Sequence, residues 1–307
     1  MAGETTSAIL SEVMTFTLQR KVLENLRSAY TYANRAWTEP GQFVPGADII
    51  KWASVPDLTA DTTPLAEGTP PTAVALSVDS VSLDAAQYGG LVKITDLAKL
   101  KSPFDLVNIA AERLSDKAQK TIDQLVRDEV AAGGTRVFSA AADTVRTDVG
   151  SGDLVTAAVL RRLNGKMKKA NIEPFADRYF RLIVSPEVEF DIRNDTATGG
   201  FIDVNKYTQP DTIIRGEVGR MEGFRIIVAD TAPTVASSVT IHLSLALGKL
   251  PGWGMGDLQT LRTYHTAPGG QSDPLHQNEF VGYKMDFGTA ILDNARYMRL
   301  ESAATAL

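Results

Sequence analysis

The sequence SPFDLVNIAAERLSDKAQKTIDQLVRDEVAAGG, residues 102–134, decides the fold more than any other stretch of the chain. Ser102 in a capping position, Pro103 at the first helical position and Asp105 in the first turn predict the start of a helix. Apolar residues then recur every three or four positions: Val107, Ala110, Leu114, Ala118, Ile122 and Leu125. Gly133-Gly134 predicts the end. The predicted helix, 104–132, is roughly 43 Å long, and its charged outer face is typical of a strut buried on one side.

The stretch before this helix predicts a long two-stranded hairpin with an irregular tip. A first apolar run precedes the tip: Ile49, Ile50 and Trp52. The tip, residues 56–72, is rich in Pro, Thr, Asp and Gly, and alternating apolar residues then predict a returning strand: Val74, Leu76 and Val78. The alternation slips by one residue at Ser80, which is typical of a bulge. A lone hairpin is at best marginally stable in water, so this one either folds back onto its own domain or lies on a neighbouring subunit.

The remainder of the chain alternates helices and strands, so the predicted fold class is α+β. Asp153 is expected to cap a helix whose C-terminal end is basic. A second helix is expected over residues 186–193. Alternating apolar residues predict four further strands, at 179–184, 224–228, 239–247 and 281–287. The glycine-rich residues 252–256 are expected to form a turn between strands.

Composition limits the chemistry that this chain can perform. Its 307 residues suffice for one large domain or two smaller ones, and the absence of cysteine excludes disulfides and thiolate sites. A net charge of −6 argues against a protein that grips nucleic acid, because phosphate binding needs a basic excess. No apolar run approaches the roughly 20 residues that cross a bilayer, and residues 1–10 lack the features of a signal peptide. We therefore expect no membrane partner and synthesis in a cytoplasm.

The three histidines do not form a recognisable site. His242 lies between apolar residues of a strand, where an exposed or locally bonded side chain is expected. His265 and His276 lack the helical spacing of a zinc site. Residues 252–256 lack the third spaced glycine and the following helix of a nucleotide loop. We expect no catalytic residue, no cofactor and no metal, and therefore no enzyme.

The order of these elements resembles the Hong Kong 97-type capsid fold of tailed bacteriophages and, within it, the capsid family named after coliphage N-four. Five local sequences carry the closer resemblance: TPLAEG at 63–68, QYG at 87–89 before Thr95-Asp96, GEVGRMEGFR at 216–225, DPLHQ at 273–277 and GYK at 282–284. They cover nearly the whole chain in order, and none is a catalytic motif. The resemblance implies a major capsid protein, a structural component of the virion.

The resemblance also implies a division of the chain and a set of partners. The implied parts are an N-terminal arm at 1–45, an E-loop at 46–92, a peripheral domain at 93–149 and 236–307 with the spine helix at 104–132, and an axial domain at 150–235. The chain is expected to assemble with itself into hexamers and pentamers of an icosahedral head that encloses double-stranded DNA without sequence-specific binding. Further expected partners are a portal protein, a separate scaffolding protein and a decoration or cement protein. Residues 196–215 are expected to face a local symmetry axis.

The E-loop carries no Lys or Arg between Trp52 and Val92, and the charged residues of that stretch are all acidic. The founding member of the fold cross-links its E-loop through a lysine, so no lysine isopeptide cross-link is expected here. We predict that acidic groups of the E-loop contact basic groups of neighbouring N-terminal arms: Asp57, Asp61, Glu67, Asp79 and Asp84 opposite Arg20, Lys21, Arg27 and Arg35. Each surface pair contributes about 0–1 kcal/mol, but many repeats add up over a shell.

Three alternative functions stay open at this point. An encapsulin-like nanocompartment would share the fold, although the long N-terminal arm and the family sequences favour a phage head. A soluble hydrolase or transferase would show turnover and a small oligomer. A minor virion component, such as a decoration protein, would not need the full fold.

Overall fold

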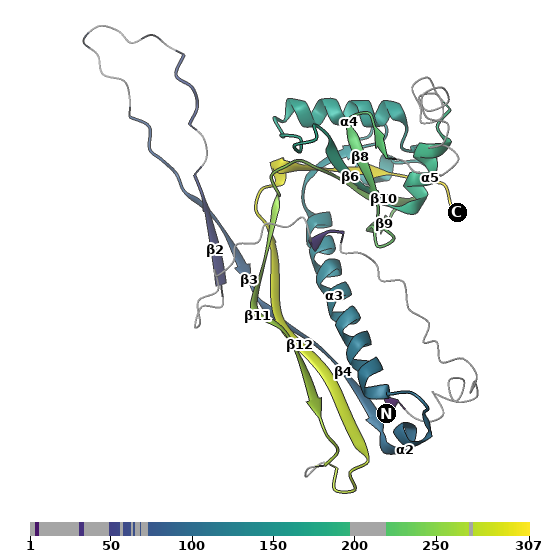
Figure 1. Ribbon diagram of the computed structural model, residues 1–307. Helices are drawn as coiled ribbons and strands as arrows, with labels where there is room; N and C mark the ends of the chain where they lie inside the picture. The colour runs from purple at the N-terminus through teal and green to yellow at the C-terminus, as the bar shows by residue number, and fades with distance from the viewer. Residues whose placement is uncertain are drawn as a thin grey trace.

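The computed structural model describes residues 4–5, 31–33, 49–55, 58–62, 64, 68, 73–196, 219–269 and 273–307. These residues form three β-sheets, and a long helix runs from one of the two larger sheets to the other (Figure 1). The helices are α2 (Asp96–Lys101), α3 (Leu106–Ala132), α4 (Ala157–Lys169) and α5 (Pro186–Asn194), with 3-10 turns η2 (Arg146–Asp148) and η3 (Asn294–Arg296). The strands are β1 (Glu4–Thr5), β2 (Ile49–Ser54), β3 (Asp79–Asp84), β4 (Ala86–Thr95), β5 (Thr135–Phe138), β6 (Phe180–Val184), β7 (Arg220–Met221), β8 (Phe224–Val228), β9 (Thr234–Ala236), β10 (Thr240–Leu247), β11 (Trp253–Thr266), β12 (Asn278–Ile291) and β13 (Tyr297–Ser302). The predicted α+β class is confirmed.

Helix α3 is amphipathic, as predicted, and its 27 residues span about 40 Å. Its buried residues follow one side: Leu106, Ala110, Leu114, Ala118, Val126 and Val130. The predicted start at residue 104 is wrong by two residues because Asp105, not Ser102, is the N-cap. The Asp105 Oδ1 atom accepts hydrogen bonds from the backbone N–H groups of Val107 and Asn108 at 3.2 and 3.3 Å. Ser102 instead ends α2, a short helix that the sequence pattern did not predict.

The four-stranded sheet has the order β1-β4-β12-β11, and α3 lies across one of its faces (Figure 1). Strands β11 and β12 are each 14 residues long, so the sheet is long and narrow. One buried cluster joins the sheet to α2 and α3: Ile94, Ala98, Leu106, Ala110, Leu114, Ala118, Val281, Tyr283 and Met285. On the opposite face Leu91 and Tyr264 are exposed. Residues 252–256, predicted to be a turn, instead enter β11 at Trp253, and Gly254 and Gly256 pair with β12.

The seven-stranded sheet has the order β5-β13-β10-β6-β8-β7, with β9 beside β10. Helices α4 and α5 lie over it in Figure 1, and its largest core cluster includes Leu160 and Leu163 of α4 with Phe180 and Phe224 of the sheet. Strands β10 and β13 fall in the stretch 236–307 that the resemblance assigned to the peripheral domain. They pair directly or through one neighbour with β6 and β8 of the stretch 150–235. The two stretches therefore share one sheet.

Helix α4 begins at Ala157, and its N-terminus is capped from a distant part of the chain. Asp195, just after α5, accepts a hydrogen bond from the Ala157 N–H at 2.8 Å. Asp153, the predicted cap, lies four residues before the helix and accepts from the Gly150 N–H at 2.6 Å instead. The prediction of an aspartate as the cap is correct in residue type but wrong in position, because the capping aspartate is Asp195 and is brought to the helix by the tertiary structure.

The third sheet is the hairpin of β2 and β3, which projects away from both larger sheets (Figure 1). Its register runs from Ile49 opposite Asp84 to Ser54 opposite Asp79. The predicted strand at Val74–Val78 is wrong, because residues 73–78 are not in a strand and pairing starts at Asp79. A physical reason lies in the sequence just after β2, because Pro56 has no N–H to donate to a ladder. Beyond its root the hairpin therefore does not fold back onto its own domain, and its contact with a neighbouring subunit stays a prediction.

Two short N-terminal pieces lie against the rest of the protein. Strand β1 extends the four-stranded sheet by pairing in parallel with β4, with Glu4 opposite Lys93. Residues 31–33 lie on α3, where Tyr32 is fully buried. The backbone N–H groups of Tyr32 and Ala33 donate to the Asp123 Oδ1 atom at 2.8 and 3.0 Å.

Candidate assembly surface

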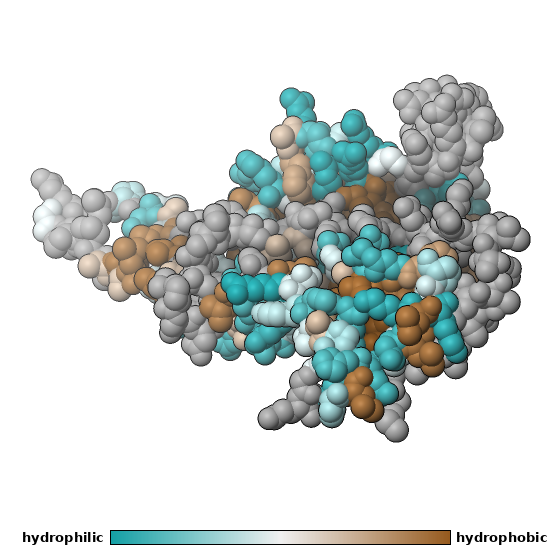
Figure 2. Space-filling view, turned by 60° about the horizontal axis from the view of Figure 1, so that its bottom comes forward, coloured by the Kyte–Doolittle hydropathy of each residue, from teal (hydrophilic) through white to brown (hydrophobic). Residues whose placement is uncertain are grey.

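The arm, a name used for residues 49–84, exposes apolar side chains that a single subunit does not cover. Beyond the paired strands, Val74, Leu76 and Val78 are 64–68% exposed. Val55 and Leu58 on the facing segment are more than half exposed as well. Figure 2 shows apolar side chains gathered on the projecting arm at the left of the view. Apolar side chains arranged in this way are typical of a surface that another chain covers.

The root of the arm is anchored firmly on the four-stranded sheet. Leu83 is buried against Ala290, with Trp52 and Val81 packed beside them. Gly288 permits this approach, because a side chain there would come within 2.5 Å of the Asp84 carbonyl oxygen. At Ala85 the chain leaves β3 and enters β4, which belongs to another sheet. The slip that we predicted at Ser80 is therefore wrong in position, and the break at Ala85 marks the base of the arm.

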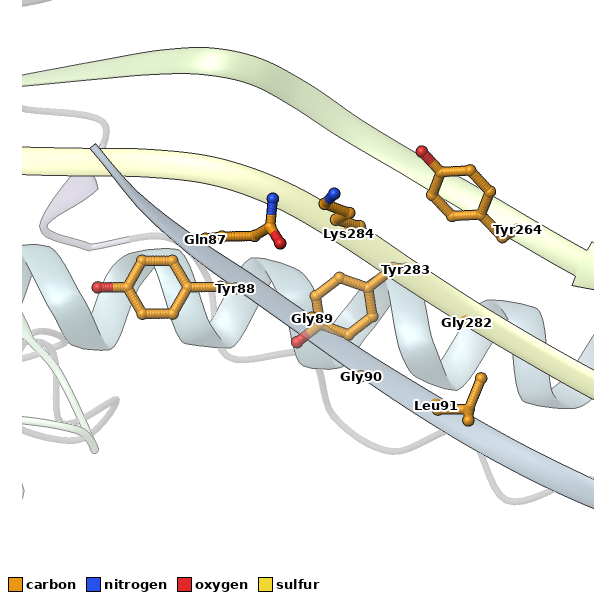
Figure 3. Close-up of a pocket in the computed structure, with 9 residues that line it drawn as sticks. All are labelled: Gln87, Tyr88, Gly89, Gly90, Leu91, Tyr264, Gly282, Tyr283 and Lys284. Atoms are coloured by element: carbon orange, nitrogen blue, oxygen red, sulfur yellow. The ribbon is translucent and has the colours of Figure 1, made fainter. Parts of the chain in front are cut away.

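A shallow trough crosses the exposed face of the four-stranded sheet (Figure 3). Strand pairing places Leu91, Gly282 and Tyr264 side by side in one row, and Gly89, Lys284 and Arg262 side by side in the next. A hollow of about 430 Å³ lies over these rows and is lined by Leu91, Gly282 and Tyr264 of the first row and by Gly89 and Lys284 of the second. Arg262 stands beside it, opposite Lys284. These six residues define the trough. Tyr283 also lines the hollow, and its ring is buried in the cluster that joins the sheet to α3.

The trough is basic, and its charges repel one another. Arg262 lies directly opposite Lys284 in the register of β11 and β12. Like charges directly opposite on neighbouring strands destabilise a sheet. Lys93 continues the same face one row beyond Leu91, and the acidic Asp286 lies at the other end of the trough. Among the described residues neither Arg262 nor Lys284 forms an ion pair. Such an arrangement is suited to binding an acidic partner.

The structure describes only some of the predicted contact residues. Asp61, Asp79 and Asp84 are exposed on the arm. The other predicted residues lie outside the described part of the chain: Asp57, Glu67, Arg20, Lys21, Arg27 and Arg35. Residues 197–215 of the predicted symmetry-axis loop lie outside it too. The contact between the acidic loop and the N-terminal arm therefore stays a prediction.

The trough itself was missed by sequence reasoning. Its signals are the pair Gly89-Gly90 in one strand and Gly282 two residues before Lys284 in another. Glycine inside a strand often marks a place where another chain approaches closely. Strand β12 pairs with β4 on one side and with β11 on the other. This order could not be read from periodicity, so the cations could not be assigned to one face.

The opposite face near the end of this sheet carries a buried carboxylate. The Glu279 side chain is 7% exposed, and its two oxygens lie 2.8 Å from Lys99 Nζ and 2.6 Å from His265 Nε2. Burial raises the pKa of Glu279, but the hydrogen bonds with Lys99 and His265 outweigh it and hold the pKa below its ordinary value. The cluster ties α2 to β11 and β12 and is structural in character.

His242 comes nearest to a catalytic arrangement but lacks the geometry. Its Nδ1 atom lies 2.9 Å from Ser185 Oγ and 3.8 Å from Glu187 Oε2. A hydrolytic triad needs the serine on one ring nitrogen and the carboxylate on the other, whereas both partners here face the same nitrogen. Ser185 also caps α5 by accepting from the Val188 N–H. His242 is buried and hydrogen-bonded under the α5 N-terminus, so of the two expected environments the bonded one is found.

Two further features bear on function. In the described ranges, His, Asp and Glu side chains nowhere gather in a group of three or more that could hold a metal ion. None of the helices in the part of the chain that the structure describes is both long and apolar enough to span a membrane. His276 lies outside any helix or strand and contacts the Pro268 carbonyl oxygen at 3.0 Å, whereas His265 is part of strand β11.

Comparison with known proteins gives a consistent result. The profile of a family described as phage capsid protein matches residues 77–298. The fold is similar to the capsid of cyanophage Pam1 (TM-score 0.75, 14% identity, 100% of both chains) and to that of Ralstonia phage GP4 (TM-score 0.73, 11% identity, 94% of this chain and 95% of that one). It is also similar to the capsid of cyanophage P-SCSP1u (TM-score 0.69, 18% identity, 95% of both chains). No protein with a curated function matches the chain in sequence.

Proposed function

The chain belongs to the phage capsid protein family, and from this premise we propose that its acidic arm binds the basic trough of a second copy in the shell. The protein is a structural component of the virion with the Hong Kong 97-type fold, as the sequence predicted. The encapsulin-like alternative is not favoured, because the matching family is that of phage capsids. The proposal concerns how one subunit holds the next.

Complementary charge within one chain is the observation that carries the proposal. Apart from Lys51 near its root, the arm contains no Lys or Arg, and Asp61 and Asp79 are exposed on it. The trough presents Arg262 and Lys284 at directly opposed positions. An acidic segment laid over these cations would relieve their mutual repulsion, and the exposed apolar residues of the arm would gain burial against Leu91 and Tyr264.

The direction of the arm favours a second copy as the partner. The arm leaves the sheet at its root beside Ala290, while β4 runs the other way from Ala86 towards the trough and α2 (Figure 1). The arm therefore points away from the trough of its own subunit. Only another copy can bring an arm and this trough together without unfolding the root.

The assembly states and partner molecules expected from the sequence are part of the same proposal. We expect hexamers and pentamers in an icosahedral head, a portal protein, a separate scaffolding protein and enclosed double-stranded DNA. The predicted four-part division, a decoration protein and assembly in the host cytoplasm remain expectations of the same kind. We propose a purely structural role, supported by the family and by the His242 geometry.

A charge-swap experiment tests the contact. Reversal of the trough (R262E with K284E) and reversal of the arm (D61K with D79K) should each prevent particle formation, measured by sedimentation and negative-stain electron microscopy. The variant that carries all four changes should recover particles, because each pair again faces its opposite charge.

The matched control reverses two exposed lysines on α4, K168E with K169E, which should assemble normally. If the trough reversal assembles like the unchanged protein, or the fourfold variant is no better than either pair, the trough is not the partner. Rescue of the arm reversal by R27E with R35E instead would assign the contact to the N-terminal arm, as predicted from the sequence.

A further inference from the structure

The two large sheets meet at a junction that is packed unusually tightly around one tyrosine. The chain crosses between the sheets at residues 248–252 and again at 292–296. Side chains added at Gly133, Gly134 and Gly252 would come within 2.6, 2.6 and 2.4 Å of atoms of Tyr297. The Tyr297 hydroxyl donates to the Val130 carbonyl oxygen of α3 at 3.1 Å. Short connections and glycines are features of a hinge between two bodies. In this structure the hinge is held in one position by the packing around Tyr297.

Tyr32 from the N-terminal arm is part of this closure. It is 0% exposed and belongs to the buried cluster in which both sheets and α3 meet. The cluster draws members from each body: Val126 and Val130 of α3, Trp253 and Phe287 of the four-stranded sheet, and Ile183, Leu245, Leu247 and Tyr297 of the seven-stranded sheet. Tyr32 is thus a side chain from a separate segment at the place where the two sheets contact each other.

A buried carboxylate on α3 holds the same segment. Asp123 lies in the interior of α3, where a charge needs compensating hydrogen bonds. Its Oδ1 atom accepts from two successive backbone N–H groups, those of Tyr32 and Ala33. Hydrogen bonds to an ionised acceptor are stronger than neutral ones. One aromatic side chain and one carboxylate therefore fix residues 31–33 at the junction.

We propose that residues 31–33 are a removable pin that fixes the angle between the two sheets. Without the pin, the junction would contain a vacancy the size of a tyrosine and a buried carboxylate that has lost two donors. A void of this size destabilises a protein interior and favours rearrangement around it, and the short connections at 248–252 and 292–296 offer the least resistance to a change of angle. The position of the N-terminal arm is in this way coupled to the shape of the subunit.

The coupling has a consequence for the shell, and that consequence alone rests on the proposed function. Curvature of a shell depends on the shape of its subunits, so loss of the pin should broaden the size distribution of particles. The primary test uses unassembled full-length subunits and does not depend on shell formation. Failure of the pin and failure of the shell role can therefore be told apart.

The test measures the distance between the two sheets by pulsed electron spin resonance. The chain has no cysteine, so K101C on α2 and K168C on α4 place two spin labels at exposed positions at opposite ends of the subunit. The unchanged subunit should give one narrow distance distribution. Y32A and D123A should each increase the width of this distribution at least twofold. Y32F, which keeps the aromatic ring, should leave the width unchanged.

Leu163→Ala is the control for general loss of packing, because Leu163 is fully buried in the core of the seven-stranded sheet, away from the junction. It should leave the distribution narrow. The proposal is overturned if Y32A, shown to be folded by circular dichroism, gives a distance distribution as narrow as that of the unchanged subunit. It is equally overturned if L163A broadens the distribution as much as Y32A.

Discussion

The seven-stranded sheet and the arm both carry regularly spaced apolar residues but use them in opposite ways. The core cluster of the sheet contains eighteen buried residues, among them Leu163 and Phe224. The cluster at the root of the arm contains two, Leu83 and Ala290. Beyond that root, Val74, Leu76 and Val78 stay exposed. The sheet is complete within one subunit, whereas the arm buries its apolar surface only when another chain covers it.

This difference separates stability from assembly in one chain. Changes in the sheet should alter the free energy of unfolding of the isolated subunit. Changes in the arm should leave that free energy nearly unchanged and alter particle formation instead. Single substitutions can test this separation, and their expected effects on the unassembled subunit decrease from the sheet to the arm.

The largest loss of unfolding free energy is expected from Glu301→Ala in the seven-stranded sheet. Glu301 is fully buried, with Arg146 Nε at 2.6 Å and Arg299 Nε at 2.9 Å from its oxygens. Arg299 is buried as well and also donates to the Ala131 carbonyl oxygen at the end of α3. Removing one partner of a buried ion pair leaves a charge uncompensated, so unfolding in urea should show a loss of about 3–5 kcal/mol.

Arg136→Ala is the matched control for this network. Arg136 lies 4.0 Å from Glu301 but its side chain is more than half exposed. Its loss should cost less than about 1 kcal/mol. If both variants lose the same free energy of unfolding, burial of the ion pair does not set the size of the loss. The stability of the seven-stranded sheet would then not come from its buried interior within one subunit.

A smaller loss is expected from Leu83→Ala at the root of the arm. Leu83 is 1% exposed and packs on Ala290 with Trp52 and Val81 beside it. We expect a loss of about 2 kcal/mol, at the lower end for a buried leucine, because so small a cluster can relax around the cavity. Hydrogen exchange should locate the change in β2 and β3. A loss spread over the seven-stranded sheet would contradict the separation of the two regions.

The sequence predicted the complete region better than the incomplete one. Helix α3 and the strands near 180–184, 224–228 and 240–247 were predicted correctly because each carries an apolar run or stripe that is buried within its own subunit. The misplaced strand at Val74–Val78 has the same apolar alternation, but no described partner pairs with it. Periodicity reports that a segment can be a strand and does not report whether a neighbour is present.

The candidate site shows the same limit. The acidic character of the arm is a local property, and it could be predicted from Asp61 and Asp79 without any structure. The trough depends on the register that places Arg262 opposite Lys284, which joins residues from two strands around a turn. Asp195 at the start of α4 is missed for the same reason, since the residue that caps the helix lies 38 positions away. Tertiary pairing, not composition, creates both features.

A modest effect is expected from acid at the end of the four-stranded sheet. The pKa of Glu279 lies below its ordinary value, because Lys99 and His265 outweigh the effect of burial. A lowered pKa means that this carboxylate stabilises the fold above its unfolded pKa of about 4.3, and that the stabilisation is lost as pH falls through the lower folded value. The free energy of unfolding of E279Q should be about 1 kcal/mol or less below that of the unchanged subunit at pH 7, and the difference should shrink as pH falls through the folded pKa.

Urea unfolding at a series of pH values measures this effect, with D286N as the control on the other face of the same strand. A difference that grows as pH falls would have the opposite sign to the one expected from a lowered pKa. It would mean that the protonated form of Glu279, not the carboxylate, stabilises the fold. The cluster with Lys99 and His265 would then not tie α2 to the sheet through charge.

The smallest effect on the isolated subunit, and the most decisive for the comparison, is expected from Leu76→Asp in the arm. Leu76 is 68% exposed, so the change should shift the free energy of unfolding by less than about 0.5 kcal/mol. In a shell the same side chain would be buried on a neighbour, where an unpaired charge is costly, so particle yield should fall sharply in sedimentation. Ser77→Asp adds the same charge one position away without removing an apolar side chain, and it should assemble better than L76D. Stable subunits that assemble normally with L76D would show that the exposed apolar residues of the arm are not covered in the shell, and the arm would then be complete without a partner.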